Sequence, residues 1–82
     1  MREQIEVESY SGYRLAEKPK NFTWRGEKYE ILEIKRQWIE EREGERRRYF
    51  EILTSPLHRE TRDVEIHLIS YDEKTAQWFI ER

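Results

Sequence analysis

The sequence contains no cysteine, so neither a disulfide nor a thiolate-bound metal ion can stabilise the fold. Its 82 residues correspond to one domain, residues 1–82, near the lower size limit for a chain that folds alone. Three tryptophans, five tyrosines and three phenylalanines are therefore expected to form much of the core. Each large ring buries on the order of 150–250 Å² when it is internal, which makes so small a core feasible.

Long hydrophobic runs are also missing. No apolar run approaches the ~20 residues that a membrane-spanning helix requires. Residues 1–6 (MREQIE) are too polar for a signal peptide. Together with the absence of cysteine, these features predict a cytoplasmic protein that does not associate with membranes.

An excess of either charge is lacking as well. Charged residues make up 41% of the chain, yet the net charge is only −2. A protein that binds nucleic acid without regard to sequence usually carries an excess of lysine and arginine, so the balance favours a surface of ion pairs. Abundant glutamate and arginine beside a single methionine are typical of heat-adapted proteins.

Five segments alternate apolar and polar side chains with the two-residue period of a β-strand. They are residues 4–10, 21–25, 46–54, 63–71 and 77–81. In residues 63–71, Val64, Ile66 and Leu68 share the face that we assign to the core. That assignment places His67 on the surface.

Residues 28–41 fit two structures. Ile31, Ile34 and Trp38 have helical spacing, and the glutamate content favours a helix, but no capping residue precedes the segment. In a strand, the apolar positions change face between Ile31 and Leu32, so the strand must bulge or bend there. We favour the bent strand because both neighbouring segments are strands.

The whole pattern predicts an all-β protein, a meander of five or six antiparallel strands that forms a small, open, SH3-like barrel. A helix over residues 28–43 would make the fold α+β instead. The first and last strands either pair with each other or leave open edges. Open edges would allow a homodimer by edge-strand pairing.

Residues for catalysis or metal binding are sparse. Only His58 and His67 could act as the base of a catalytic triad, and only Asp63 and Asp72 are aspartates. His58 falls in a loop and His67 on the strand face assigned to the surface, so we expect neither to be catalytic. With Glu60 and Glu65 they match no known metal-ligand spacing. The three glycines stand alone in separate turns, so no phosphate-binding loop is present. We therefore expect no enzyme, no metal or other cofactor, and no small-molecule substrate.

Basic and aromatic residues gather between positions 35 and 49, which is the pattern of a single-stranded nucleic-acid site. The candidate residues are Lys35, Arg36, Trp38, Arg42, Arg46, Arg47, Arg48 and Tyr49. Arginines would contact phosphates, and the two rings would stack on bases. The same hairpin also holds Glu40, Glu41, Glu43 and Glu45. The arginines could instead pair with these carboxylates across the strands.

A surplus of aromatic residues supports a second hypothesis, binding to another protein. The rings that fall opposite the inferred core belong to Tyr10, Tyr13, Tyr49, Tyr71 and Phe79. They could pack under loops, or line a groove for an extended peptide. An exposed strand edge would serve the same kind of partner. The sequence leaves nucleic acid, another protein and a second copy of the chain open as partners.

Aromatic and turn residues recur in an order that resembles a known family. They are Glu8-Ser9-Tyr10, Arg14-Leu15, Pro19, Phe22-x-Trp24-x-Gly26, Tyr29-x-Ile31, Trp38, Tyr49-Phe50, Tyr71-Asp72 and Trp78-Phe79. The pattern covers nearly the whole chain. It resembles a small prokaryotic domain of unknown function, found alone or joined to Y-family-polymerase-like proteins of mutagenic DNA repair. The resemblance implies an accessory module in DNA repair and assigns no catalytic or binding residue.

Overall fold

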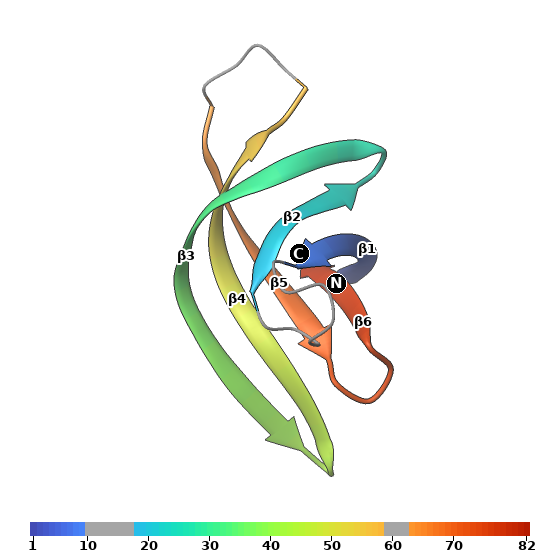
Figure 1. The fold of residues 1–82 in the computed structure, drawn as a ribbon. Helices are drawn as coiled ribbons and strands as arrows, with labels where there is room; N and C mark the ends of the chain where they lie inside the picture. The colour runs from blue at the N-terminus through green and yellow to red at the C-terminus, as the bar shows by residue number, and fades with distance from the viewer. Residues whose placement is uncertain (10–17, 59–62) are drawn as a thin grey trace.

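The computed structural model describes residues 1–9, 18–58 and 63–82, whose regular structure consists of antiparallel strands (Figure 1). They are β1 (Arg2–Ser9), β2 (Pro19–Trp24), β3 (Glu27–Arg42), β4 (Glu45–Pro56), β5 (Glu65–Asp72) and β6 (Gln77–Glu81). The predicted all-β meander is confirmed. The alternative of a helix over residues 28–43 is wrong, because β3 occupies almost all of them. The described residues include no helix that could span a membrane.

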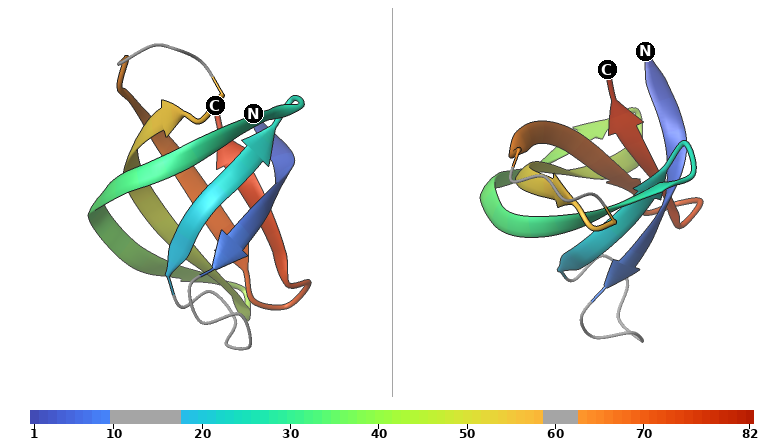
Figure 2. Two further views of the ribbon diagram at one scale, coloured as in Figure 1. Left: turned by 45° about the horizontal axis from the view of Figure 1, so that its top comes forward. Right: turned by 90° about the horizontal axis from the view of Figure 1, so that it is seen from above.

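The sheet closes on itself, because each strand pairs with the next and β1 pairs with β6 (Figure 2). The two ends of the chain lie side by side. The Met1 amino group donates a hydrogen bond to the Arg82 carbonyl oxygen (2.8 Å), and the Arg82 amide donates one to the Met1 carbonyl oxygen (2.7 Å). The barrel is thus closed rather than open. Strands β1 and β6 pair with each other, which is the first of the two predicted alternatives, so their paired edges are not open to a homodimer.

The core fills the barrel and is largely aromatic, as the composition predicted. Its most deeply buried hydrophobic side chains, at most 2% exposed, include Phe22, Phe50, Ile52, Ile69 and Ile80. Phe22 stacks on Tyr29 with ring centroids 5.0 Å apart. Trp78 packs against Phe50 and Tyr71 at 5.6 and 4.9 Å. These side chains come from four of the six strands, so packing in the core holds those strands together.

The inward face of β5 is opposite to the predicted one. Ile69 is fully buried, whereas Val64 and Ile66 are 49% and 60% exposed. The register explains this difference, because Ile69 lies directly opposite Phe50 of β4 and also opposite a buried isoleucine of β6. His67 shares the face of Ile69 and is half-buried, so its assignment to the surface was wrong.

Strand β3 changes neighbours along its length. It pairs with β2 only as far as Glu30, and beyond that point β4 is its sole strand neighbour among the described residues. Its register against β4 shifts between Ile31 and Glu33, and again between Ile34 and Arg36. The first shift confirms the bulge predicted beside Ile31, and the second was not predicted. Bulges bend a strand and increase its twist, which fits the sharp curve of β3 in Figure 1.

Residues 36–51 form a hairpin arm, along which the register of β3 against β4 runs without a break. The turn residues Glu43 and Gly44 have φ angles of +53° and +82°, as a two-residue type I′ turn requires. Strand β4 pairs with β5 from Arg47 onward, whereas no described strand pairs with the other side of β3 in the arm. We call residues 36–42 the arm edge. They lie along the left margin of the lower half of Figure 1.

Candidate interaction surface on the hairpin arm

The eight predicted site residues lie on the arm or just before it, but strand alternation divides them between its two faces. Trp38 and Tyr49 lie directly opposite each other in register and so share one face, the Trp38 face. This face also carries Arg36, Arg42 and Arg47. Arg46 and Arg48 point to the opposite face, and Lys35 occupies the second bulge. The run of three arginines therefore does not form one continuous patch.

An aromatic pair dominates the Trp38 face. The rings of Trp38 and Tyr49 stack with centroids 5.5 Å apart and planes only 6° from parallel. The Arg36 guanidinium lies 5.2 Å from the Trp38 ring, within the range of a cation–π contact. The Trp38 indole N–H donates a hydrogen bond to Glu40 (3.0 Å). Trp38 is half-buried, so part of this fixed ring remains accessible.

Glutamates compensate the arginines of the arm. Arg46 and Arg48 both pair with Glu73 of the β5–β6 turn, at 3.9 and 2.8 Å. Arg47 lies 3.8 Å from Glu45, and Arg36 binds Glu51 at 3.0 Å. A hydrogen bond to Tyr49 is the first cause that raises the pKa of the Arg47 guanidinium, so the arginine keeps its charge. The arm is thus a surface of mixed charge.

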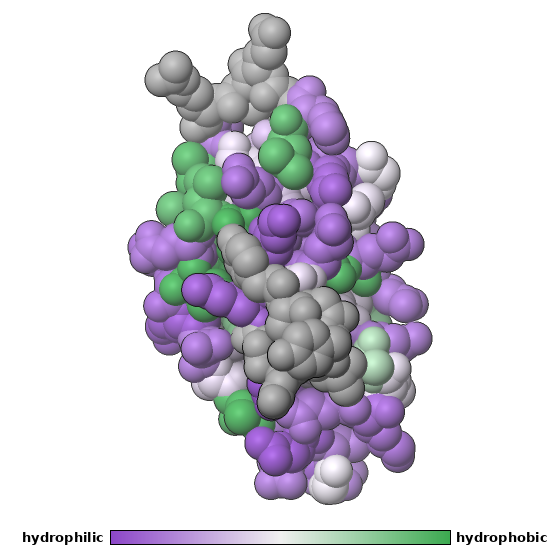
Figure 3. Space-filling view, in the orientation of Figure 1, coloured by the Kyte–Doolittle hydropathy of each residue, from purple (hydrophilic) through white to green (hydrophobic). Residues whose placement is uncertain are grey.

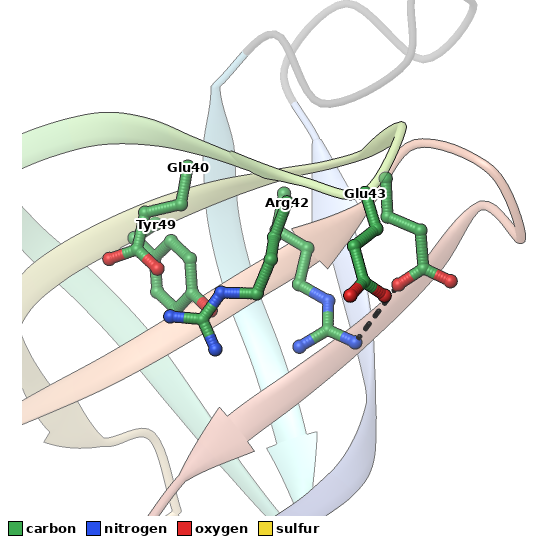
Figure 4. Close-up of a pocket in the computed structure, with 6 residues that line it drawn as sticks. Glu40, Arg42, Glu43 and Tyr49 are labelled. Carbon is green, nitrogen blue, oxygen red and sulfur yellow. Dashed lines mark ion pairs between the residues drawn. The ribbon is translucent and has the colours of Figure 1, made fainter.

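A hollow of about 430 Å³ lies on the arm near its turn. Its lining consists of Glu40, Arg42, Glu43, Glu45, Arg47 and Tyr49. Figure 4 shows Arg42 between Glu40 and Glu43, with a dashed line for the pair of Arg47 with Glu45. Three carboxylates face two guanidinium groups here, so the hollow does not favour an anionic ligand.

A second hollow, of about 400 Å³, lies beside the arm edge. It is lined by Gln37, Trp38, Ile39, Arg48, Tyr49 and Phe50. Ile39, in the middle of the edge, is 49% exposed. On the face drawn in Figure 3, hydrophobic residues form small separate patches on a mostly hydrophilic surface. An apolar contact at the arm would therefore be local.

The other aromatic residues that were predicted to lie outside the core have different positions. Tyr71 is buried at 2% exposure and belongs to the core, so that prediction was wrong. Its position follows from the register of β5, which places it on the same face as Ile69. Phe79 is half-buried beneath the Arg2 guanidinium, 4.1 Å from the ring centre. Tyr10 and Tyr13 lie outside the described residues.

His67 is part of a packed aromatic group. The rings of Phe22, Trp24 and Tyr29 surround it at 5.6–6.0 Å in edge-to-face geometry. Its Nε2 atom lies 3.1 Å from a carboxylate oxygen of Glu65. Among the described residues, no three histidine or carboxylate side chains gather as metal ligands would. His58 lies at the end of a described segment, and Glu60 lies outside it.

A group of side chains around a single carboxylate, that of Glu3, joins the two ends of the chain to the β2–β3 turn. The sequence analysis did not identify this group. Glu3 accepts hydrogen bonds from Arg25 (2.5 Å), from the Trp24 indole (3.0 Å) and from Arg82 (2.7 Å). Arg25 and then Trp24 are the main causes that lower the pKa of Glu3 from 4.5 to about 2. No local pattern links these positions, because the barrel closure alone brings them together. The cluster around Glu3 stabilises the closed end of the barrel.

Comparison with known proteins gives one match. The chain belongs to the family described as Domain of unknown function (DUF6504), whose model matches residues 1–82. No curated protein and no solved structure matches the chain significantly. The match spans the same residues as the resemblance that the sequence shows. It assigns no partner.

Proposed function

We propose that this member of the DUF6504 family is a non-catalytic protein-interaction module that binds a polypeptide along its arm edge. The observation that carries the proposal is the single-sided pairing of residues 36–42, which have β4 as their only strand neighbour in the described parts of the chain. An edge strand offers a row of backbone N–H and C=O groups to an added strand. The barrel has otherwise closed its sheet.

Side chains around the edge favour a polypeptide partner. Trp38 and Ile39 supply accessible apolar surface on opposite faces of the same strand. Aromatic residues of this kind are frequent anchors at protein interfaces, where the surrounding rim is polar. The compensated charges of Arg36 and Arg47 fit such a rim better than they fit a polyanion. The affinity would then depend on main-chain hydrogen bonds and a few side-chain anchors.

Selection from a random-peptide library tests this proposal. We expect enriched peptides to bind with little dependence on salt and to shift the backbone NMR signals of residues 36–42. Replacing Trp38 with alanine should weaken binding by about tenfold or more, as is typical for an aromatic anchor. The matched control is Trp24→Ala, which removes a tryptophan from the barrel end instead. Failure to enrich peptides, or peptides that map elsewhere, would contradict the proposal.

Single-stranded nucleic acid is a second candidate partner, and the stacked pair of Trp38 and Tyr49 is the observation that favours it. A base could stack on Trp38 while Arg36 and Arg42 on the same face contact phosphates. Such binding would suit an accessory role beside a Y-family-polymerase-like repair protein, the association that the sequence resemblance implies. We rank this candidate second because glutamates neutralise much of the positive charge.

Fluorescence titration with a short single-stranded DNA tests the second candidate. Binding should quench tryptophan fluorescence and weaken steeply as salt rises, with a slope of about −0.7 for each phosphate contacted. Arg42→Ala should reduce both the affinity and the slope, whereas Lys28→Ala, which removes a cation paired with Glu8 in the barrel, should change neither. The absence of binding at low ionic strength would exclude this partner.

A further inference from the structure

The arm edge carries a self-complementary sequence. Residues 35–41 read KRQWIEE, with two cations before the apolar centre and two carboxylates after it. A two-fold axis turns such a segment end to end, so its basic half meets the acidic half of an identical strand. We propose that the partner of the arm edge is a second copy of this chain, paired antiparallel through a two-fold axis at Trp38. This inference rests on the proposed function, because it names the polypeptide that the edge binds.

The register of the pairing follows from the charges. In a continuous antiparallel sheet, residues directly opposite each other share a face. With the axis at Trp38, Arg36 faces Glu40 of the second copy, Gln37 faces Ile39, and the two Trp38 side chains lie side by side. The symmetry forms every such contact twice. The strand therefore gains two ion pairs on the Trp38 face in one register.

Neighbouring registers are less favourable. An axis at Ile39 would place Arg36 opposite Arg42 of the second copy and Trp38 opposite Glu40. An axis at Glu40 would place that carboxylate opposite its own copy. Like charges directly opposite each other destabilise a strand pair. The position of the charges thus selects the Trp38 register over those on its acidic side.

The local structure suits an added strand over these positions. The second bulge lies at Lys35, and the register from Arg36 to Arg42 is regular, so no bulge interrupts the edge where the second strand would pair. Arg36, Gln37, Ile39 and Glu40 are all exposed. The hollow of about 400 Å³ beside Gln37, Trp38 and Ile39 provides space for side chains of the second copy.

Existing contacts of the two charged residues are compatible with the pairing. Arg36 binds Glu51 through its Nε and one terminal nitrogen. A guanidinium has five N–H donors, so it can also reach a carboxylate of the second copy. Glu40 accepts one hydrogen bond from the Trp38 indole and has further acceptor capacity. The ion pairs can therefore form without breaking the contacts within each chain.

Charge reversal and its rescue test the inference by sedimentation over a range of protein concentrations. The wild-type chain should form a dimer. Arg36→Glu and Glu40→Arg should each weaken it by about tenfold or more, because each variant places like charges opposite each other. An equal mixture of the two variants should form a heterodimer, since every opposing pair is then complementary. The double variant, Arg36→Glu with Glu40→Arg, should also regain the dimer.

Glu30→Arg is the matched control, because it reverses an exposed charge on the same strand where that strand is paired on both sides. It should leave the dimer unchanged. Circular dichroism checks that each variant is folded, and rescue in the mixture does not depend on the stability of either variant alone. A monomeric wild-type chain would overturn the inference, as would a dimer insensitive to the reversals or a mixture without rescue. A monomer that binds library peptides at residues 36–42 would overturn self-pairing alone and leave the proposed function intact.

Discussion

The hairpin arm, residues 36–51, and the rest of the described barrel, which we call the body, share strands β3 and β4. Different interactions stabilise the two regions. In the body, β3 has neighbours on both sides, and Tyr29 is buried against Phe22. In the arm, β3 has β4 alone among the described residues, and Ile39 is 49% exposed. Strand β3 therefore changes from a central strand, paired on both sides, to an edge strand that pairs with β4 alone among the described strands. The two bulges mark the transition.

This difference in packing suggests that the body provides most of the stability of the fold, whereas the arm is available for binding a partner. Burial of a large apolar side chain contributes about 1.5–3 kcal/mol, and the body holds nearly all such side chains. Exposed ion pairs of the kind found in the arm contribute about 0.2–1 kcal/mol each, and a stacked aromatic pair adds a comparable amount. The body can thus maintain the fold while the arm presents its edge. A small domain gains from this division, because a single small core leaves only a narrow margin of stability.

Truncating one apolar side chain in each region gives the largest expected contrast. Phe22→Ala should lower the free energy of unfolding by about 3–5 kcal/mol, because it leaves a cavity among fully buried residues. Ile39→Ala should lower it by less than about 1 kcal/mol, since half of that side chain is already in water. Urea denaturation measures both values. If Phe22→Ala does not fold, the milder Ile80→Val should still cost about 0.5–1.5 kcal/mol. Equal losses in body and arm would contradict the comparison.

The arm turn gives the next effect. Gly44 has φ +82°, and a Cβ added there would meet no atom within 4 Å, so the cost of alanine is purely one of backbone conformation. We expect Gly44→Ala to cost about 1 kcal/mol, and Gly44→Asn to cost less, because asparagine tolerates this region better. Hydrogen exchange should accelerate in residues 36–46, which precede the pairing of β4 with β5, and stay slow at Ile69. A uniform acceleration would show that the arm and body unfold as one unit.

The sequence predicted the course of β3 because its signal is local. The change of apolar face between Ile31 and Leu32 requires a bulge in any strand that contains both. The second bulge, at Lys35, has no such signal, since polar residues surround it and carry no preference for a face. In β5 the local signal was misleading. Ile66 and Ile69 lie on opposite faces and are equally apolar, so only the pairing with β4 and β6 decides which one is buried.

The candidate site was predictable in part for the same reason. The sequence placed basic and aromatic residues in one hairpin, and it raised the alternative that glutamates compensate the arginines. It did not identify the glutamate that binds Arg46 and Arg48. That residue is Glu73, which lies 25 positions beyond Arg48 in the chain. Contacts of this length depend on strand order, as does the cluster around Glu3 at the closure of the barrel.

Acid should weaken the body through Glu3. Its pKa is about 2 in the folded chain and 4.5 ordinarily, so the contribution of its ion pairs is complete above pH 4.5 and is lost as the pH falls toward 2. We expect thermal unfolding to show a stronger pH dependence over this range in the wild type than in Glu3→Gln. The control Glu30→Gln removes an exposed carboxylate on β3 and should retain the wild-type dependence. Identical profiles for all three chains would contradict the role of Glu3 in closure.

The smallest expected change in the free energy of unfolding comes from the hydroxyl of Tyr71, where the body meets the arm. Tyr71 is directly opposite Arg48, its ring is buried, and its hydroxyl has no hydrogen-bond partner among the described residues. Burial is the first cause that raises the pKa of this hydroxyl. An unpaired buried hydroxyl costs free energy, and its removal leaves no other group unsatisfied.

Tyr71→Phe should therefore leave the free energy of unfolding unchanged or raise it by up to about 1 kcal/mol. The matched control is Tyr29→Phe, which removes the hydroxyl that donates to Glu27 at 2.9 Å and should be destabilising. Urea denaturation of the two variants gives the sign directly. A loss of more than about 1 kcal/mol in Tyr71→Phe would mean that the hydroxyl has a partner. Water or another polar group would then reach the Tyr71 hydroxyl, although the ring is buried. The solvent-excluded core would end at the ring of Tyr71 and would not include its hydroxyl.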